Sequence, residues 1–187
     1  MDKIKNAIII HGPGKSGTTL LYQLLSMHKE LCWLSGYNDR YPNWSNIIGI
    51  VNRLGNIPNQ NIFRKYRFWP KPAEAYKFWE YYFPGFREES YTRIENQDIE
   101  NCKKEINTLL RRQKKNRILI KITGLARASI IEKIFKNPKI VYIDRDPRAV
   151  IMSYYKARWL YKDSKIVEDS TSKMERLNNY LNLYKSF

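Results

Sequence analysis

The stretch from Ala7 to Met27, AIIIHGPGKSGTTLLYQLLSM, constrains the fold of this chain more than any other. It begins with an uninterrupted apolar run, 7–10, which is typical of a strand buried on both faces of a parallel sheet. A loop follows at 12–17, and its three glycines let the backbone turn sharply and bring several N–H groups close to a bound group. The segment 18–27 then has helical spacing. We expect it to pack on the sheet through four leucines, Leu20, Leu21, Leu24 and Leu25.

The loop and the helix after it together predict an anion site. A helix N-terminus presents unpaired amides and the positive end of its dipole to the residues that precede it. Lys15 adds a mobile cation, and Thr18 and Thr19 add two hydroxyls. The Walker A pattern of ATP and GTP loops is not met, because it requires a glycine where Ile9 stands. The favoured ligand is therefore a phosphate or a chemically similar group.

A second motif lies at 139–155, KIVYIDRDPRAVIMSYY. An apolar strand is expected at 140–143, and Arg145 stands at its end. Pro147 suits the first turn of a helix, where a missing N–H costs nothing. Ser153 would lie about two turns into that helix, given about 3.6 residues per turn. Taken alone, Arg145 is open to interpretation as one partner of a structural ion pair with Asp144 or Asp146, and Ser153 as an ordinary helix-face serine.

The two motifs resemble those of sulfotransferases that use 3′-phosphoadenosine 5′-phosphosulfate (PAPS). Lys15-Ser16-Gly17-Thr18-Thr19 is similar to their 5′-phosphosulfate loop, and Arg145, Pro147 and Ser153 reproduce the spacing of their 3′-phosphate site. The resemblance implies that Lys15 stabilises the leaving group, with 16–19 holding the phosphosulfate and Arg145 with Ser153 holding the 3′-phosphate. It implies no metal. It covers residues 6–40 and 117–157 well and the rest only loosely.

Further strands at 30–35 and 117–123 alternate with helices at 98–115 and 128–135, and another helix is expected at 172–184. This alternation predicts a three-layer α/β sandwich with a central parallel sheet, which is also the P-loop-NTPase-like fold that the resemblance implies. Ligands in such folds bind at the carboxyl ends of the strands, where both motifs lie. One domain over 1–187 is expected at this length.

The acceptor's proton needs a base, and here the sequence departs from part of the family. Cytosolic members that act on small molecules have Lys-Thr-His before the second motif, whereas this chain has Lys121-Ile122-Thr123. The match of Lys121 implies a role at the leaving group, a structural pairing being the alternative. Carbohydrate-type members resemble one another in using a carboxylate downstream of the loop, and the candidates are Asp39 and Glu74. Glu74 is preferred, because the stretch around it resembles bacterial carbohydrate-type sulfotransferases.

That stretch, 70–86, is the most aromatic part of the chain. A helix is expected to begin at Pro72 and to carry most of the rings. They favour a packed satellite core, since aromatic stripes usually are core. The alternative is a platform or lid for a sugar ring or a phenol.

Charge and composition indicate the general class of binding partner but do not identify a particular one. Lys plus Arg number 34 against 18 Asp plus Glu, which gives a net charge of +16 and predicts attraction to polyanions in general. The resemblance implies a small-molecule or carbohydrate acceptor and no nucleic acid. The N-terminal apolar run is too short for a signal peptide or a membrane span, and Cys32 and Cys102 have no metal-ligand spacing, so a cytoplasmic protein with reduced thiols is expected.

Length is a second departure. Relatives usually continue well beyond this point and contact the 3′-phosphate and adenine from a later loop, for which the sequence after Ser153 has no equivalent. A natural short form, a fragment and a protein with weakened donor binding all remain open, as does the oligomeric state. Two other functions also remain open: a P-loop kinase or NTPase with Asp144 as a magnesium ligand, and a non-catalytic polyanion-binding protein.

Overall fold

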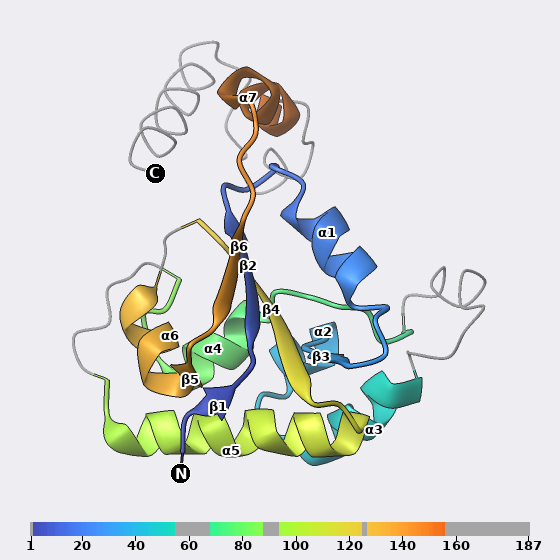
Figure 1. The fold of residues 1–187 in the computed structure, drawn as a ribbon, viewed down its shortest axis with the longest axis vertical. Coiled ribbons are helices and arrows are strands. Elements are labelled where there is room, and N and C mark those ends of the chain that lie inside the picture. The colour runs from blue at the N-terminus through green and yellow to red at the C-terminus, as the bar shows by residue number, and fades with distance from the viewer. Residues whose placement is uncertain (1, 55–67, 88–93, 125–126, 156–187) are drawn as a thin grey trace, which may run out of the picture.

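The computed structural model describes residues 2–54, 68–87, 94–124 and 127–155, and the helix expected at 172–184 lies outside them (Figure 1). The described strands are β1 (Ile4–Lys5), β2 (Ile8–Gly12), β3 (Leu31–Trp33), β4 (Arg117–Thr123), β5 (Phe135–Lys136) and β6 (Lys139–Tyr142). The described helices are α1 (Thr18–Leu25), α2 (Gly36–Arg40), α3 (Ser45–Leu54), α4 (Tyr76–Tyr82), α5 (Asn96–Gln113), α6 (Ala128–Ile134) and α7 (Pro147–Tyr155).

The central sheet has four parallel strands in the order β3-β4-β2-β6. A small second sheet pairs β1 with β5, also in parallel. In the register of β2 and β4, Ile10 lies opposite Lys121 and Gly12 lies opposite Thr123. The two central strands therefore end side by side, and the segments that follow them start from the same edge of the sheet.

Alternating side chains of the strands supply two separate cores. Ile9, Ile118 and Ile120 face the larger core, which α4, α5 and α6 cover. Ile10 and Leu119 face the smaller one, which is closed by α1. Helices thus lie on both faces of a parallel sheet, which confirms the three-layer α/β prediction (Figure 1).

The face of α1 that contacts the sheet agrees only in part with the expected one, because Leu21 and Leu25 pack against the smaller core but Leu20 and Leu24 do not. The buried residues of this helix are Thr18 and Tyr22, and the hydroxyl of Tyr22 donates to the carbonyl of Leu34 at 3.3 Å. Leu20 and Leu24 are instead 63% and 52% exposed. The leucine spacing is helical, but the large ring of Tyr22 with its polar end suits the space above β3 and β4, and this contact sets the rotation of the helix.

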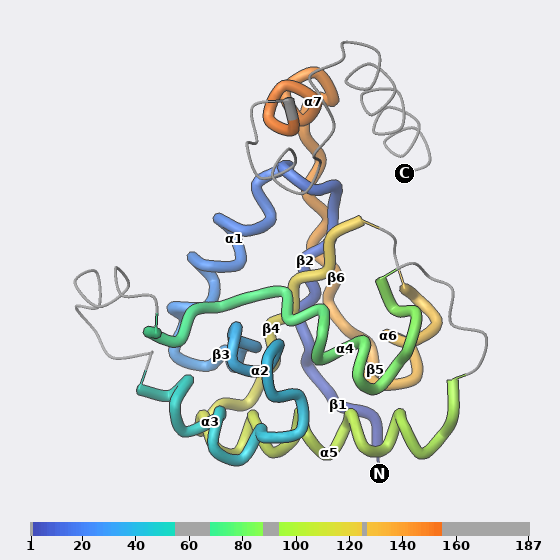
Figure 2. The backbone as a smooth tube through the Cα atoms, turned by 180° about the vertical axis from the view of Figure 1, so that it is seen from behind, coloured from blue at the N-terminus to red at the C-terminus, as the bar shows by residue number. Residues whose placement is uncertain are grey.

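The aromatic helix begins later than expected, at Tyr76 instead of Pro72. Pro72 forms an isolated antiparallel bridge with Ser35, and the amide of Ala73 donates to the carbonyl of Leu34 at 2.8 Å. Because this backbone is already bonded beside the end of β3, it cannot enter a helix. Figure 2 shows the segment crossing from the side of β3 to α4.

Most rings of the aromatic stretch are core residues, as the packing interpretation predicted. Five of them are buried in the larger core, Phe78, Trp79, Tyr82, Phe83 and Phe86. Cys32 and Cys102 lie in the same core as free thiols, and burial raises the pKa of each. The described helices include none with both the length and the apolar character needed to cross a membrane.

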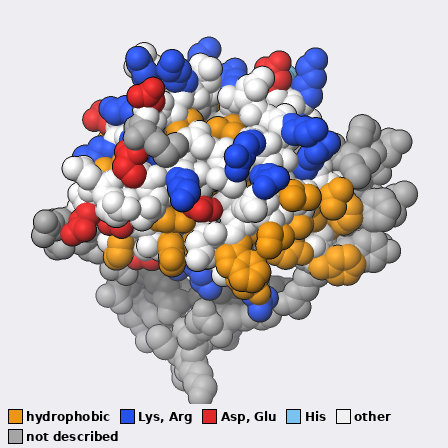
Figure 3. All heavy atoms as spheres, turned by 90° about the horizontal axis from the view of Figure 1, so that it is seen from below, with side chains coloured by type: hydrophobic (Ala, Val, Ile, Leu, Met, Phe, Trp, Pro, Cys, Tyr) orange, Lys and Arg blue, Asp and Glu red, His pale blue; other side chains and the backbone are white. Residues whose placement is uncertain are grey.

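The surface seen in Figure 3 carries numerous Lys and Arg side chains, with hydrophobic side chains gathered toward one side. On α3 the exposed apolar residues are Ile47, Ile50 and Leu54, and exposed Trp44 directly precedes this helix. The basic character of the sequence is therefore visible as a cationic surface, and it is not confined to the glycine-rich loop.

Two isoleucines on neighbouring parts of the sheet test this arrangement. Ile120 is fully buried on β4, whereas Ile140 on β6 is 61% exposed. Ile120→Ala should lower the free energy of unfolding by about 2–5 kcal/mol, because it removes packed atoms and leaves a cavity. Ile140→Ala, the matched control, should change it by less than about 1 kcal/mol. Urea denaturation measures both, and equal losses would contradict the layer assignment.

Candidate functional site

The glycine-rich loop joins β2 to α1 in a conformation that depends on its glycines. Gly17 is the N-cap of α1 with φ 106°, a left-handed value that favours glycine. A Cβ on Gly12 would lie 2.6 Å from the carbonyl oxygen of Ile143, so only glycine lets the ends of β2 and β6 approach this closely. The hydroxyl of Ser16 donates to the carbonyl of Pro13 at 2.7 Å and closes the turn.

The second motif lies directly against this loop. The amide of Ile143 donates to the backbone carbonyl of His11 at 2.9 Å, and the guanidinium of Arg145 donates to the carbonyl of Lys15 at 2.9 Å. A Cβ on Gly14 would lie 1.9 Å from the hydroxyl oxygen of Tyr154. The fold therefore brings together two segments 130 residues apart in sequence.

The remaining residues of that motif lie on α7. Pro147 opens the helix, as predicted, and Ser153 is half-buried within it. Asp146, one of the two carboxylates considered as a partner for Arg145, forms an ion pair with Arg148 at 2.7 Å.

Lys121 connects the loop to the candidate base. It is 7% exposed on β4, and its ammonium donates to the hydroxyl oxygen of Thr19 at 2.7 Å. The same ammonium lies 3.4 Å from Oε1 of Glu74. One buried cation thus lies between the first turn of α1 and the segment before α4.

Glu74 is held by two hydroxyls as well as by Lys121. The hydroxyl of Thr123 donates to Oε1 of Glu74 at 2.5 Å, and the hydroxyl of Tyr76 lies 3.5 Å from the same oxygen. Tyr76 also donates to the carbonyl of Thr123 at 2.9 Å. We call the five residues Thr19, Lys121, Glu74, Thr123 and Tyr76 the polar chain.

Asp39, the other candidate base, has a different environment. Its Oδ1 accepts from the amide of Lys77 at 2.7 Å, in the first turn of α4. This contact ties α2 to the start of α4, because the carboxylate satisfies an amide that has no partner within its own helix. No contact of Asp39 with the polar chain is found among the described residues.

Burial governs the ionisation of the polar chain. It lowers the pKa of Lys121, and the negative charge of Glu74 opposes that shift. Burial also raises the pKa of Tyr76, and the negative charge of Glu74 raises that pKa further. The Tyr76 hydroxyl therefore remains protonated near neutral pH and can donate a hydrogen bond.

Sequence reasoning found Thr19, Lys121 and Glu74 but missed their connection, and it missed Tyr76, Thr123 and Tyr154 as part of the site. The alternation of 117–123 does place Lys121 on the same face as Leu119. The pairing of β2 with β4, which brings that face beneath α1, cannot be read from spacing alone.

A P-loop-like strand, loop and helix beside a second strand-to-helix motif defines the α/β sulfotransferase fold. The sulfotransferase domain model matches residues 5–185, and the chain therefore belongs to the sulfotransferase family. Among solved structures it is similar to the sulfotransferase STF9 from Mycobacterium avium, with a TM-score of 0.57 and 13% sequence identity. That match covers 99% of this chain and 56% of the STF9 chain, so this chain spans little more than half of that structure. No curated protein sequence matches significantly.

The polar chain makes a measurable prediction about Lys121. NMR titration of its side-chain nitrogen should give a pKa below the ordinary value of 10.5, because burial disfavours the charged form. Glu74→Gln should lower that pKa further, since it removes the charge that stabilises the ammonium. Glu132→Gln, an exposed change on α6, is the control and should leave it unaltered. A higher Lys121 pKa in Glu74→Gln would contradict the assigned interaction.

Proposed function

We propose that this chain is a sulfotransferase that moves a sulfuryl group from PAPS to a hydroxyl or amine of a small-molecule or carbohydrate acceptor. The observation that carries the proposal is the position of Lys121, within 2.7 Å of Thr19 on the loop and 3.4 Å of Glu74. The Lys121 ammonium contacts both the loop proposed to bind the donor and the candidate base. This arrangement is suited to the transfer of a group from a donor to an acceptor. The family and the fold support the same reaction.

The loop supplies groups suited to the phosphosulfate. Backbone amides at the start of α1, with Ser16, Gly17, Thr18 and Thr19, would hold its terminal oxygens. Lys15, on the loop between Gly14 and Ser16, would follow the negative charge that develops on the leaving oxygen. Arg145 and Ser153 would hold the 3′-phosphate. The contact of Arg145 with the carbonyl of Lys15 supports a donor site built jointly by the loop and the second motif.

Glu74 is the proposed general base, and Lys121 is proposed to act at the leaving group. Glu74 would take the acceptor's proton as the acceptor oxygen or nitrogen bonds to sulfur. The bond between sulfur and the bridging oxygen breaks, and its electron pair remains on the leaving 3′-phosphoadenosine 5′-phosphate. Lys15 and Lys121 would stabilise that charge. Thr123 and Tyr76 would orient the carboxylate.

The loop lysine provides the first test. Lys15→Ala should reduce sulfuryl transfer from PAPS by about 10²–10³-fold, because a cation is lost where charge develops. Circular dichroism should remain unchanged, and Lys133→Ala, an exposed change on α6, should keep full activity. Titration should show 3′-phosphoadenosine 5′-phosphate binding more tightly than ATP. Full transfer by Lys15→Ala, or magnesium-dependent ATP turnover, would overturn the mechanism.

The two carboxylates provide the second test. Glu74→Gln should lower kcat by about 10²–10⁴-fold, because the amide cannot accept the acceptor's proton, while donor affinity stays close to that of the unmodified protein. Asp39→Asn should affect kcat little, since an amide oxygen can still accept from Lys77. Single-turnover transfer assays measure both variants. A large loss in Asp39→Asn with none in Glu74→Gln would make Asp39 the base.

A further inference from the structure

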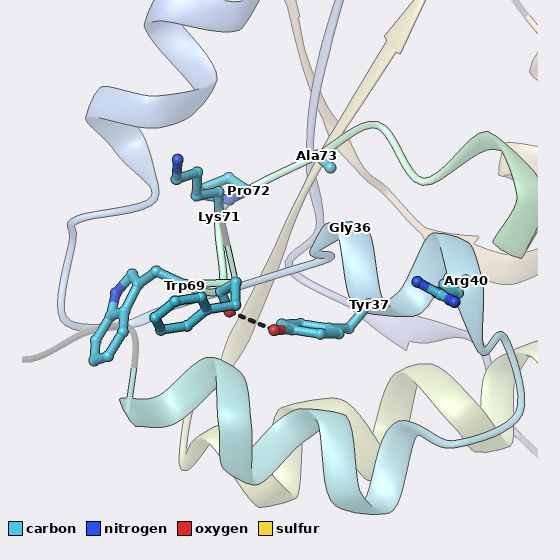
Figure 4. Close-up of a pocket in the computed structure, with 8 residues that line it drawn as sticks. Gly36, Tyr37, Arg40, Trp69, Lys71, Pro72 and Ala73 are labelled. Carbon is cyan, nitrogen blue, oxygen red and sulfur yellow. Dashed lines mark hydrogen bonds between the residues drawn. The ribbon is translucent and has the colours of Figure 1, made fainter. Parts of the chain in front are cut away.

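A cavity of about 630 Å³ lies beside the segment that precedes Glu74, on the side of the sheet where β3 is the edge strand. Its wall includes α2 and the segment that leads into α4 (Figure 4). Ala73 lines it, and Glu74 is the next residue, so the segment that carries the proposed base also forms part of the cavity wall.

The lining combines aromatic rings with cations. Tyr37, Phe68 and Trp69 supply the rings, and Arg40 and Lys71 supply the positive charges. Figure 4 places Lys71 and Arg40 on opposite sides of Tyr37. No carboxylate belongs to the described lining. Asp39 precedes Arg40 in sequence, but its carboxylate accepts from the amide of Lys77.

Part of this wall is fixed before any ligand arrives. The hydroxyl of Tyr37 donates to the carbonyl of Phe68, which joins α2 to the segment opposite it. The bridge of Ser35 with Pro72 and the bond from Ala73 to Leu34 fix the same segment at its other end. A preformed wall reduces the ordering cost of binding, and flat rings suit the faces of sugar rings.

We propose that this cavity binds an acidic saccharide, with its sugar rings on Tyr37 and Trp69 and its carboxylate or sulfate groups paired with Arg40 and Lys71. The proposal rests on the proposed function for its orientation, because Glu74 marks the end at which the acceptor hydroxyl reacts. It specifies the acceptor as anionic. A neutral saccharide would leave both cations without their ligand charges.

Direct binding tests the cavity independently of transfer. Isothermal titration would compare two probes, a tetrasaccharide of alternating glucuronic acid and N-acetylglucosamine and the neutral tetrasaccharide of N-acetylglucosamine. The acidic probe should bind about tenfold or more tightly, and its advantage should fall as salt is raised. Arg40→Gln and Lys71→Gln should each weaken the acidic probe by about five- to tenfold and leave the neutral probe unchanged. Lys104→Gln, an exposed change on α5, is the control, because it removes the same single positive charge from a site away from the cavity.

The outcomes separate this inference from the proposed function. Equal affinity for the two probes, or equal effects of Arg40→Gln and Lys104→Gln, would overturn it even if sulfuryl transfer to another acceptor depends on Lys15. Suppose instead that the acidic probe binds in a way that depends on Arg40 and Lys71, but that 3′-phosphoadenosine 5′-phosphate does not bind. That result would support the acidic-saccharide site and contradict the assignment of the donor. Where transfer occurs, Arg40→Gln should raise KM for the acidic acceptor and leave kcat unchanged, because it removes binding common to ground and transition states.

Discussion

The ammonium of Lys121 is the contact on which the arrangement of the site depends. A buried cation is costly unless oxygens surround it, and here Thr19 and Glu74 provide them from two different segments. The interaction therefore fixes the first turn of α1 and the segment before α4 relative to β4. The structural ion pair of this lysine is compatible with its proposed catalytic role, because the packing that desolvates the charge also places it between the loop and Glu74.

The segment 68–75 determines how the two sides of the site meet. Its bonds to Ser35 and Leu34 fix it beside the end of β3, its first residues line the cavity, and Glu74 extends from it to β4. The aromatic helix that follows anchors it, since most of the rings of α4 are buried in the larger core. Within the aromatic stretch, Phe78 and Trp79 pack the core as the packing interpretation predicted, while Tyr76 contacts Thr123 in the polar chain.

The second motif also contacts the glycine-rich loop, which its resemblance to the 3′-phosphate site of sulfotransferases does not by itself imply. Arg145 is expected to bind a phosphate, yet it also donates to the backbone of Lys15, and Tyr154 lies close to Gly14. The conformation of the loop is therefore coupled to the position of α7. Substitutions on α7 that disturb this contact can therefore alter the conformation of the glycine-rich loop, although α7 is distant from the loop in sequence.

The sequence by itself determined the parallel α/β architecture and the two strand-to-helix motifs, because apolar runs, glycines and a first-turn proline act through local backbone geometry. It also identified Lys121 and Glu74 as residues of interest. The tertiary structure decided which face of α1 is buried, where the aromatic helix begins, and which carboxylate lies beside Lys121. These features depend on the order of strands in the sheet and on hydrogen bonds such as Ala73 to Leu34, which join residues distant in sequence and leave no periodic signal.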